Sequence, residues 1–189
     1  MIFPLTGSLI DGKASYKWLA DNAMNVRGCV SICSAFLRSS ILEDFSRRLP
    51  DNAQVRIIAR WRLEDLLVGA SDLEAYEVSK KMGWDFYICP NFHGKVFVFP
   101  PEGILVGSAN ATGSGLGLLS NSNSEVCTVV GESEENKSLI ENLFSSSKKM
   151  TDELLQCVLW GLQQRQSGLF TSVATMSGKQ YVPPSSNRK

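Results

Sequence analysis

Residues 93–110 read HGKVFVFPPEGILVGSAN, two apolar runs separated by a short polar segment. The alternation over Lys95–Phe99 and Ile104–Val106 predicts two strands, and Pro100–Gly103 has the composition of a tight turn. Side chains two positions apart on a strand share a face. The polar residues that flank this hairpin should therefore meet at one end of a sheet.

Those flanking residues combine an imidazole, an ammonium group, a hydroxyl and an amide: His93, Lys95, Ser108 and Asn110. Each is common by itself, because a lone histidine is usually structural, a lone lysine is solvated, and Gly-Ser-x-Asn is ordinary turn composition. Together, His, Lys, Gly, Ser and Asn at offsets 0, 2, 14, 15 and 17 should arise by chance on the order of once per 10,000 such chains. The set is therefore the candidate site.

Outside the hairpin, hydrophobic patterning alternates between helical and strand periods, which predicts an α/β domain. Ser71-Asp72-Leu73-Glu74 has the form of a capping box and opens a helix that Gly83 ends. The other expected strands are 29–35, 55–59, 85–89 and 126–130, and the other expected helices are 15–23, 39–49, 134–145 and 152–164.

The length of 189 residues suits one domain, which we place at residues 1–166 with a polar tail or linker at 167–189. Hydrophobic residues make up 43% and charged residues 20%, as in ordinary globular proteins. No apolar run approaches the roughly 20 residues of a membrane helix, and no secretory leader is visible. We therefore expect a cytoplasmic protein.

The balance of charges and the number of cysteines limit how the protein can bind nucleic acid and whether disulfides stabilise it. The 19 basic and 19 acidic residues cancel, so any contact with nucleic acid must be local, through a cleft and not a broad basic face. The odd number of cysteines favours reduced thiols over a disulfide framework, and the spacing of Cys29 and Cys33 fits zinc ligands poorly. The five cysteines are Cys29, Cys33, Cys89, Cys127 and Cys157.

The candidate site resembles the active-site motif of the phospholipase D superfamily, H-x-K-x4-D-x6-G-S-x-N, filled here by His93, Lys95, Gly107, Ser108 and Asn110. The resemblance covers roughly residues 29–131. It implies a mixed β-sheet flanked by helices on both faces, and it points to the single-motif nucleases, including the metal-independent catalytic domains of bacterial restriction enzymes. One position departs from the motif, because Pro100 replaces the aspartate. That position follows a strand, away from the catalytic end, so we expect a structural role for it.

The family's mechanism implies that His93 attacks phosphorus to form a phosphohistidine, while a second histidine protonates the leaving oxygen and then activates water. This chain has a single histidine and no internal repeat. We therefore expect a symmetric homodimer in which each copy supplies His93. The resemblance assigns the non-bridging oxygens to Lys95 and Asn110 in place of a metal, so no cofactor is expected.

Two further positions take roles from the resemblance. Ser108 would hydrogen-bond the phosphate. Glu125, preceded by Asn123-Ser124, matches the acidic position of the family's small nucleases and would accept from the second imidazole nitrogen of His93. A surface carboxylate at the start of a strand is the alternative for Glu125.

Arg60, Trp61 and Arg62 follow the strand 55–59, on the side where open α/β sheets usually bind ligands. They are candidates for contacts with flanking phosphates or a stacked base, and a solvated arginine pair around a partly buried tryptophan fits equally well. Gly113, Gly115 and Gly117 match neither a dinucleotide-binding nor a P-loop spacing, so we interpret them as a flexible loop.

The leading hypothesis is a metal-independent endonuclease that acts on DNA. A phospholipid phosphodiesterase or transphosphatidylase is the first alternative, and the single motif without an apolar or amphipathic membrane segment favours the nuclease. The second alternative is a catalytically silent module for dimerisation or nucleic-acid binding, which the intact His93, Lys95, Ser108 and Asn110 disfavour.

Overall fold

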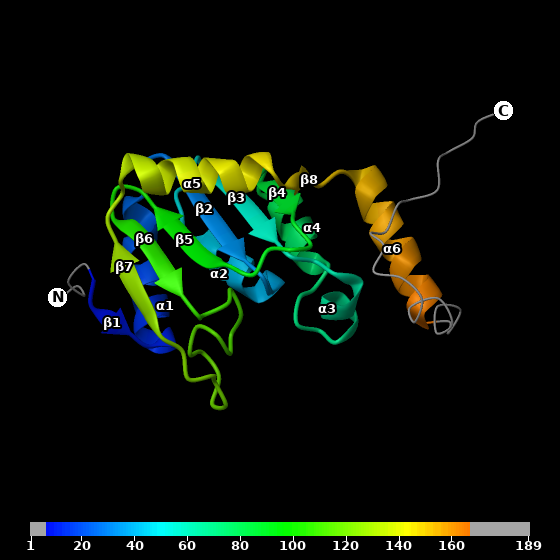
Figure 1. The fold of residues 1–189 in the computed structure, drawn as a ribbon, viewed down its shortest axis with the longest axis horizontal. Helices are drawn as coiled ribbons and strands as arrows, with labels where there is room; N and C mark the ends of the chain where they lie inside the picture. Colours follow the sequence, from blue (N-terminus) through cyan, green and yellow to red (C-terminus); the bar gives the residue numbers. More distant parts are fainter. Residues whose placement is uncertain (1–6, 167–189) are drawn as a thin grey trace. The chain divides into compact units, whose positions relative to one another are not determined.

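The computed structural model describes residues 7–166, so the predicted tail at 167–189 lies outside them. The chain divides into two compact units, residues 1–149 and 150–189, which are described separately. The first unit contains the sheet and its helices (Figure 1). The second contributes α6, Asp152–Gln166, close to its predicted span. The domain boundary at residue 166 stays a prediction.

The described strands form one mixed sheet in the order β1-β7-β6-β5-β2-β3-β4-β8. Strands β2, β3 and β4 are mutually parallel, and every other pairing is antiparallel. The bounds are β1 Leu9–Ile10, β2 Cys29–Ser34, β3 Gln54–Ala59, β4 Asp85–Ile88, β5 Lys95–Phe99, β6 Gly103–Gly107, β7 Cys127–Val130 and β8 Lys148–Lys149. The predicted mixed sheet is therefore confirmed, and the hairpin at its centre is β5–β6.

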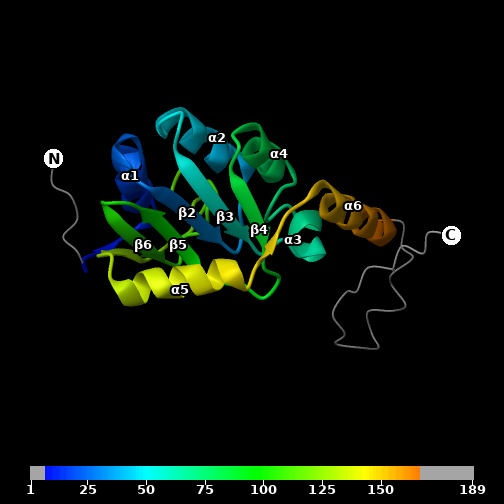
Figure 2. The ribbon, with the colours of Figure 1, turned by 90° about the horizontal axis from the view of Figure 1, so that it is seen from above.

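Helices cover both faces of the sheet, as predicted. Figure 2 shows α5 along one face and α1, α2 and α4 along the other. Helix α3 follows β3 at one edge of the sheet (Figure 1). The bounds are α1 Gly12–Asn22, α2 Ser39–Arg48, α3 Leu63–Leu67, α4 Glu74–Lys81 and α5 Glu134–Ser145, and a 3₁₀ turn, Ala23–Asn25, follows α1.

The alternation within β5 builds the core on both faces. Phe97 and Phe99 are buried, and the Phe99 ring packs between Trp18 of α1 and Phe45 of α2, at centroid distances of 6.2 and 5.7 Å. The intervening valines pack on the opposite cluster beneath α5. Each buried phenylalanine contributes about 1.5–3 kcal/mol relative to exposure. This packing holds β5 in place between the two layers of helices.

The structure corrects the predicted capping box at the start of α4. Ser71 is buried and its Oγ accepts from the amide of Leu37, 3.1 Å away, so it is committed to the β2–α2 connection. Asp72 caps instead, because its carboxylate accepts from the amides of Ala75 at 3.1 Å and Ser39 at 2.9 Å. One carboxylate thus serves the first turns of α2 and α4. The end of α4 is as predicted, since Gly83 adopts φ +69°.

Candidate active site

The strand register brings the predicted site residues to one end of the sheet, where the central strands β2 and β6 end and β5 begins. Ser34 pairs with Lys95 on one side and Ala59 on the other, so β2 and β3 end where β5 begins. Gly107 pairs with Cys127, so β6 ends where β7 begins. The loop that follows β6 and helix α3 both extend from this end (Figure 1). The expectation that the hairpin gathers its polar ends at one end of the sheet is confirmed.

The segment that carries His93 is anchored from both sides. Phe92 is buried in the cluster beneath α5, and a Cβ at Gly94 would lie 2.6 Å from the Phe92 ring. Only glycine fits there without a shift. His93, between them, is exposed. The buried Phe92 ring and the close contact between it and Gly94 therefore fix the segment so that the His93 imidazole faces solvent at this end of the sheet.

Lys95 turns back toward this segment, and its Nζ donates to the carbonyl oxygen of His93 at 2.9 Å. Burial lowers the pKa of Lys95 below its ordinary value, Glu125 opposes this shift, and Arg60 adds to it. The ammonium therefore lies within electrostatic reach of both charges. A partly desolvated cation in this position is suited to binding an anion.

Ser108 and Glu125 form a second part of the site. The Ser108 hydroxyl donates to the Glu125 carboxylate and accepts from the amide of Val126 at 3.0 Å. Asn123 donates to the other oxygen of Glu125, also at 3.0 Å. The strands approach closely here, because a Cβ at Gly107 would lie 2.5 Å from Cys127. The predicted contact between Glu125 and the imidazole stays a prediction.

Asn110 reaches across to the end of β2. Its Oδ1 accepts from the amide of Phe36 at 3.1 Å, and Ser34, which the sequence analysis did not select, accepts from the amide of Ala111 at 2.9 Å. No described residue accepts from Nδ2 of Asn110. Because the carbonyl side is tied down, the amide presents its NH₂ group. That group is a donor of the kind that a phosphate oxygen requires.

The segment after β3 departs from the sequence interpretation. Trp61 is 3% exposed and packs on Phe86 at a centroid distance of 4.9 Å, so its ring is not available to stack on a base. Arg60 forms two hydrogen bonds with Asp65, at 2.7 and 2.5 Å. Arg62 is exposed and donates to the Pro90 carbonyl at 2.6 Å. Of the three residues, only the arginines remain candidate contacts.

The glycines after Asn110 have a packing role that the interpretation as a flexible loop missed. A Cβ at Gly115 would lie 2.5 Å from the carbonyl oxygen of Asn110, and one at Gly117 would lie 2.7 Å from the amide nitrogen of Lys13. A Cβ at Gly12 would in turn lie 2.4 Å from the Gly115 carbonyl oxygen. The loop is therefore packed between the start of α1 and the backbone of Asn110. Close approach explains these glycines.

Pro100, which replaces the motif aspartate, lies at the opposite end of β5 from Lys95. Five steps along a strand at about 3.3 Å each separate the two positions by roughly 16 Å. The Pro100 carbonyl accepts from the amide of Arg27 at 2.7 Å, in the loop that leads into β2. Its placement away from the catalytic end agrees with the sequence prediction.

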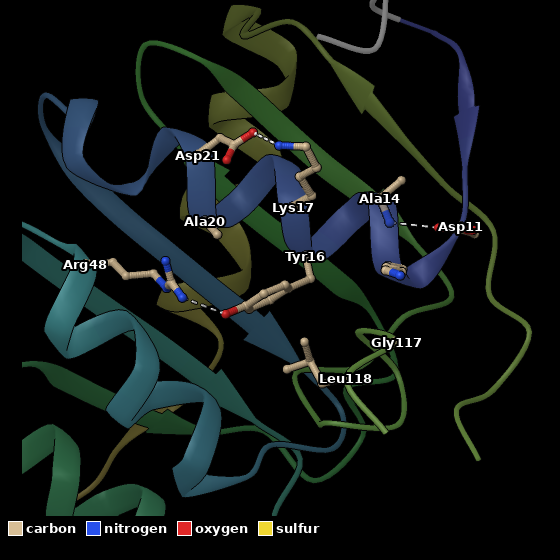
Figure 3. Close-up of a pocket in the computed structure, with 10 residues that line it drawn as sticks. Asp11, Ala14, Tyr16, Lys17, Ala20, Asp21, Arg48, Gly117 and Leu118 are labelled. Atoms are coloured by element: carbon tan, nitrogen blue, oxygen red, sulfur yellow. Dashed lines mark hydrogen bonds and ion pairs between the residues drawn. The ribbon is translucent and has the colours of Figure 1, made fainter. Parts of the chain in front are cut away.

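A cavity of about 590 Å³ lies beside the loop that follows Asn110, between α1 and the end of α2. Figure 3 shows the Tyr16 hydroxyl joined to Arg48, which donates to it at 2.9 Å, and Leu118 on the loop below the Tyr16 ring. The residues that line it are Asp11, Lys13, Ala14, Tyr16, Lys17, Ala20, Asp21, Arg48, Gly117 and Leu118. None of these residues belongs to the motif, so the candidate site is the end of the sheet that carries His93 and Asn110, and not this cavity.

Within residues 7–166, no three His, Cys, Asp or Glu side chains gather closely enough to hold a metal ion. In the same range, none of the helices has the length and apolar run that crossing a bilayer takes. All five cysteines have free thiols.

Comparison with solved structures identifies the fold. No protein-family model matches the sequence, and no curated protein matches it. The structure is similar to that of Nuc from Salmonella typhimurium, a phospholipase D family member (TM-score 0.55, 15% identity), over 77% of this chain and 99% of that one. The chain has the phospholipase D fold. The resemblance found in the sequence is thereby confirmed at the level of the fold.

Two further structures with this fold agree. NucT from Helicobacter pylori matches with a TM-score of 0.58 and 16% identity, over 76% of this chain and 98% of its own. Phosphatidylserine synthase from Haemophilus influenzae matches with a TM-score of 0.52 and 12% identity, over 86% of this chain but only 47% of its own. Nuc and NucT are therefore matched over nearly their whole length, with about a quarter of this chain outside the match, and this chain spans about half the length of the synthase.

Proposed function

We propose that this chain is a metal-independent phosphodiesterase, an endonuclease that hydrolyses DNA through a phosphohistidine intermediate at a homodimer interface. One observation supports the proposal: Val96 pairs with Val106 and Gly107 with Cys127, so the segments that carry His93, Lys95, Ser108 and Asn110 begin from the same end of the sheet. The phospholipase D fold, and a match that covers nearly the whole length of Nuc and NucT, support it.

In the proposed reaction an imidazole nitrogen of His93 attacks phosphorus, and the bond from phosphorus to the leaving oxygen breaks. His93 of the second copy donates a proton to that oxygen. The same imidazole then takes a proton from water, whose oxygen attacks phosphorus and releases the first His93. Lys95 and the NH₂ group of Asn110 stabilise the charge on the non-bridging oxygens.

The contacts at Ser108 refine its role. Its hydroxyl proton is directed to Glu125, and its oxygen already accepts from the amide of Val126. We assign Ser108 and Glu125 to one hydrogen-bonded unit that orients the phosphate side of the site. In this arrangement Glu125 acts through Ser108, and its link to the imidazole is a separate expectation.

The main alternative is hydrolysis of a phospholipid, because the synthase shares the fold. The deciding assay incubates the protein with DNA and, separately, with phospholipid vesicles, each in excess EDTA. We expect cleavage of DNA, no loss of activity on chelation, and complete loss in His93→Ala with the fold intact. Activity that disappears with EDTA and returns with magnesium would contradict the mechanism, and cleavage of the vesicles alone would favour the alternative. If neither substrate is cleaved, the chain is a silent module.

Mixed dimers test the shared site. Wild type and His93→Ala are co-refolded in varying ratio, and activity is plotted against the wild-type fraction. Because nucleophile and acid are the same residue in different copies, only wild-type homodimers contain both groups, and activity should follow the square of that fraction. A linear dependence would mean that each chain acts alone.

A further inference from the structure

Two arginines on or just after β3 have similar surroundings and differ in how many of their nitrogens are occupied. Arg56 donates from Nε to Ser31 at 2.9 Å and from both terminal nitrogens to Glu141, and it lies over the Phe144 ring at 4.1 Å. All three of its nitrogens are bonded. This is a structural arginine, which fastens α5 to the sheet.

Arg60 forms the same kind of ion pair, with Asp65, at the end of the sheet that carries the candidate site, but one of its nitrogens makes no hydrogen bond to a described residue. Its Nε and Nη2 donate to Asp65, and the guanidinium lies over the Phe36 ring at 4.7 Å. Its Nη1 has no acceptor among the described residues, and it is not among the buried polar atoms that lack a partner. The side chain is 13% exposed.

The pair is rigid because Asp65 is itself held. Asp65 is 6% exposed, its carboxylate accepts from the amide of Arg62 at 3.3 Å, and its carbonyl accepts from the amides of Ala70 and Ser71. A carboxylate fixed from its own backbone cannot follow a moving arginine. The guanidinium is therefore held in one orientation, with the cost of ordering it already met in the free protein.

Backbone hydrogen bonds relate Arg60 to the motif. The amide of Arg60 donates to the Ala35 carbonyl at 3.3 Å, and the amide of Ala35 donates to the Gly94 carbonyl at 3.1 Å. Arg60 thus lies in the same row as Gly94, two strand spacings or about 10 Å away. Its charge acts on Lys95. Asp65, in α3, holds the guanidinium through the two hydrogen bonds from Nε and Nη2.

We infer that Arg60 binds the phosphate adjacent to the scissile one in a polynucleotide, and that Asp65 is a positioning residue for Arg60. The inference rests on the proposed function and names its substrate class. A chain of phosphates offers both positions at once, whereas an isolated phosphodiester offers only one. The site would therefore favour a polynucleotide over any substrate with a single phosphate.

The experiment compares an oligonucleotide with a dinucleotide that contains one phosphodiester, by the ratio of their kcat/KM values. In Arg60→Ala this ratio should fall about tenfold, as for loss of one charge-assisted phosphate contact, and the salt dependence on the oligonucleotide should weaken by about one phosphate. Arg56→Ala is the matched control, because it removes a similar ion pair four residues earlier, within β3. Its ratio and salt dependence should match wild type even if its melting temperature falls.

Asp65→Asn separates positioning from charge. The ratio should fall less than in Arg60→Ala, through a higher KM for the oligonucleotide, while the salt dependence persists because the guanidinium keeps its charge. An equal loss on both substrates in Arg60→Ala, or the same change of ratio in Arg56→Ala, would overturn the inference.

Binding of the oligonucleotide, measured by fluorescence anisotropy in a His93→Ala background, keeps the two proposals distinct. If wild type cleaves neither substrate, the proposed function fails. Arg60 is then judged by whether Arg60→Ala weakens the salt dependence of binding relative to Arg56→Ala. An unchanged dependence would reject the inference by itself.

Discussion

Gly115 connects the loop after the motif to the backbone of Asn110, and replacing it with alanine should damage the site through that contact alone. The added Cβ would lie 2.5 Å from the Asn110 carbonyl oxygen and 2.8 Å from its amide nitrogen. Both are backbone atoms, which cannot rotate away. Gly115 has no left-handed φ, so close approach is the cause of any effect.

The size of the effect follows from the required movement. Ordinary contact begins at 3.4 Å, so the loop and Asn110 must separate by about 0.9 Å. Overpacking of this kind costs about 1–3 kcal/mol. A displacement of about 1 Å at a group that positions substrate lowers kcat on the order of 100-fold. Asn110 cannot absorb the shift elsewhere, because its side chain is bonded to the amide of Phe36.

The assay measures hydrolysis of a chromogenic phosphodiester, with thermal unfolding followed in parallel. Gly113→Ala is the matched control from the same loop, because its Cβ would meet only the side chain of Leu119, at 3.3 Å or more. That side chain is 58% exposed and can rotate away. We expect kcat to fall about 100-fold in Gly115→Ala, with a melting temperature lower by about 2–4 °C for each kcal/mol lost. Gly113→Ala should match wild type.

Two outcomes would refute this reasoning. Gly115→Ala with the rate and stability of wild type would mean that the loop yields without moving Asn110. Equal damage in Gly113→Ala would mean that loop composition, and not contact with Asn110, sets the rate.

Two further predictions concern pH. Burial lowers the pKa of Lys95 from its ordinary value of 10.5, so kcat/KM should fall as the pH rises, with a midpoint below pH 10.5. Glu125 raises this pKa, so Glu125→Gln should move that midpoint to lower pH. A midpoint that does not move in the pH profile would contradict the electrostatic link. Burial raises the pKa of the Cys33 thiol from 9.0 to about 12, so this thiol stays protonated in the folded protein while the unfolded thiol ionises. Stability measured by urea unfolding should therefore fall above pH 9.0, and the fall should be shallower in Cys33→Ala; an equal fall in the variant would contradict the assignment.

Much of the fold follows from local patterns that the sequence alone displays. The alternation in residues 95–99 assigns Phe97 and Phe99 to one face, because the period of a strand is two regardless of what surrounds it. The turn at Pro100–Gly103 then returns the chain beside itself. These two features suffice to bring His93 and Asn110 to the same end of the sheet, and the motif spacing points to the phospholipase D fold.

The shortest helix and strands were not predicted, because a hydrophobic period needs several residues to become visible. Helix α3, Leu63–Leu67, and the two-residue strands β1 and β8 contain too few residues to show a period. They exist because neighbouring strands and loops offer them hydrogen bonds.

Tertiary structure alone decided which polar groups pair and which glycines are crowded. The sequence pattern at 71–74 fits a capping box, yet Ser71 bonds to Leu37 and Asp72 takes the cap. Arg60 and Trp61 were both candidate contacts, with a partly buried tryptophan as the alternative, yet the structure buries the indole and pairs the guanidinium with Asp65. A local pattern shows what a residue is able to do. Which acceptor satisfies a backbone amide depends on groups far along the chain. Ser71 is 34 positions from the Leu37 amide and Asn110 is 74 positions from the Phe36 amide, and folding alone brings each pair to 3.1 Å.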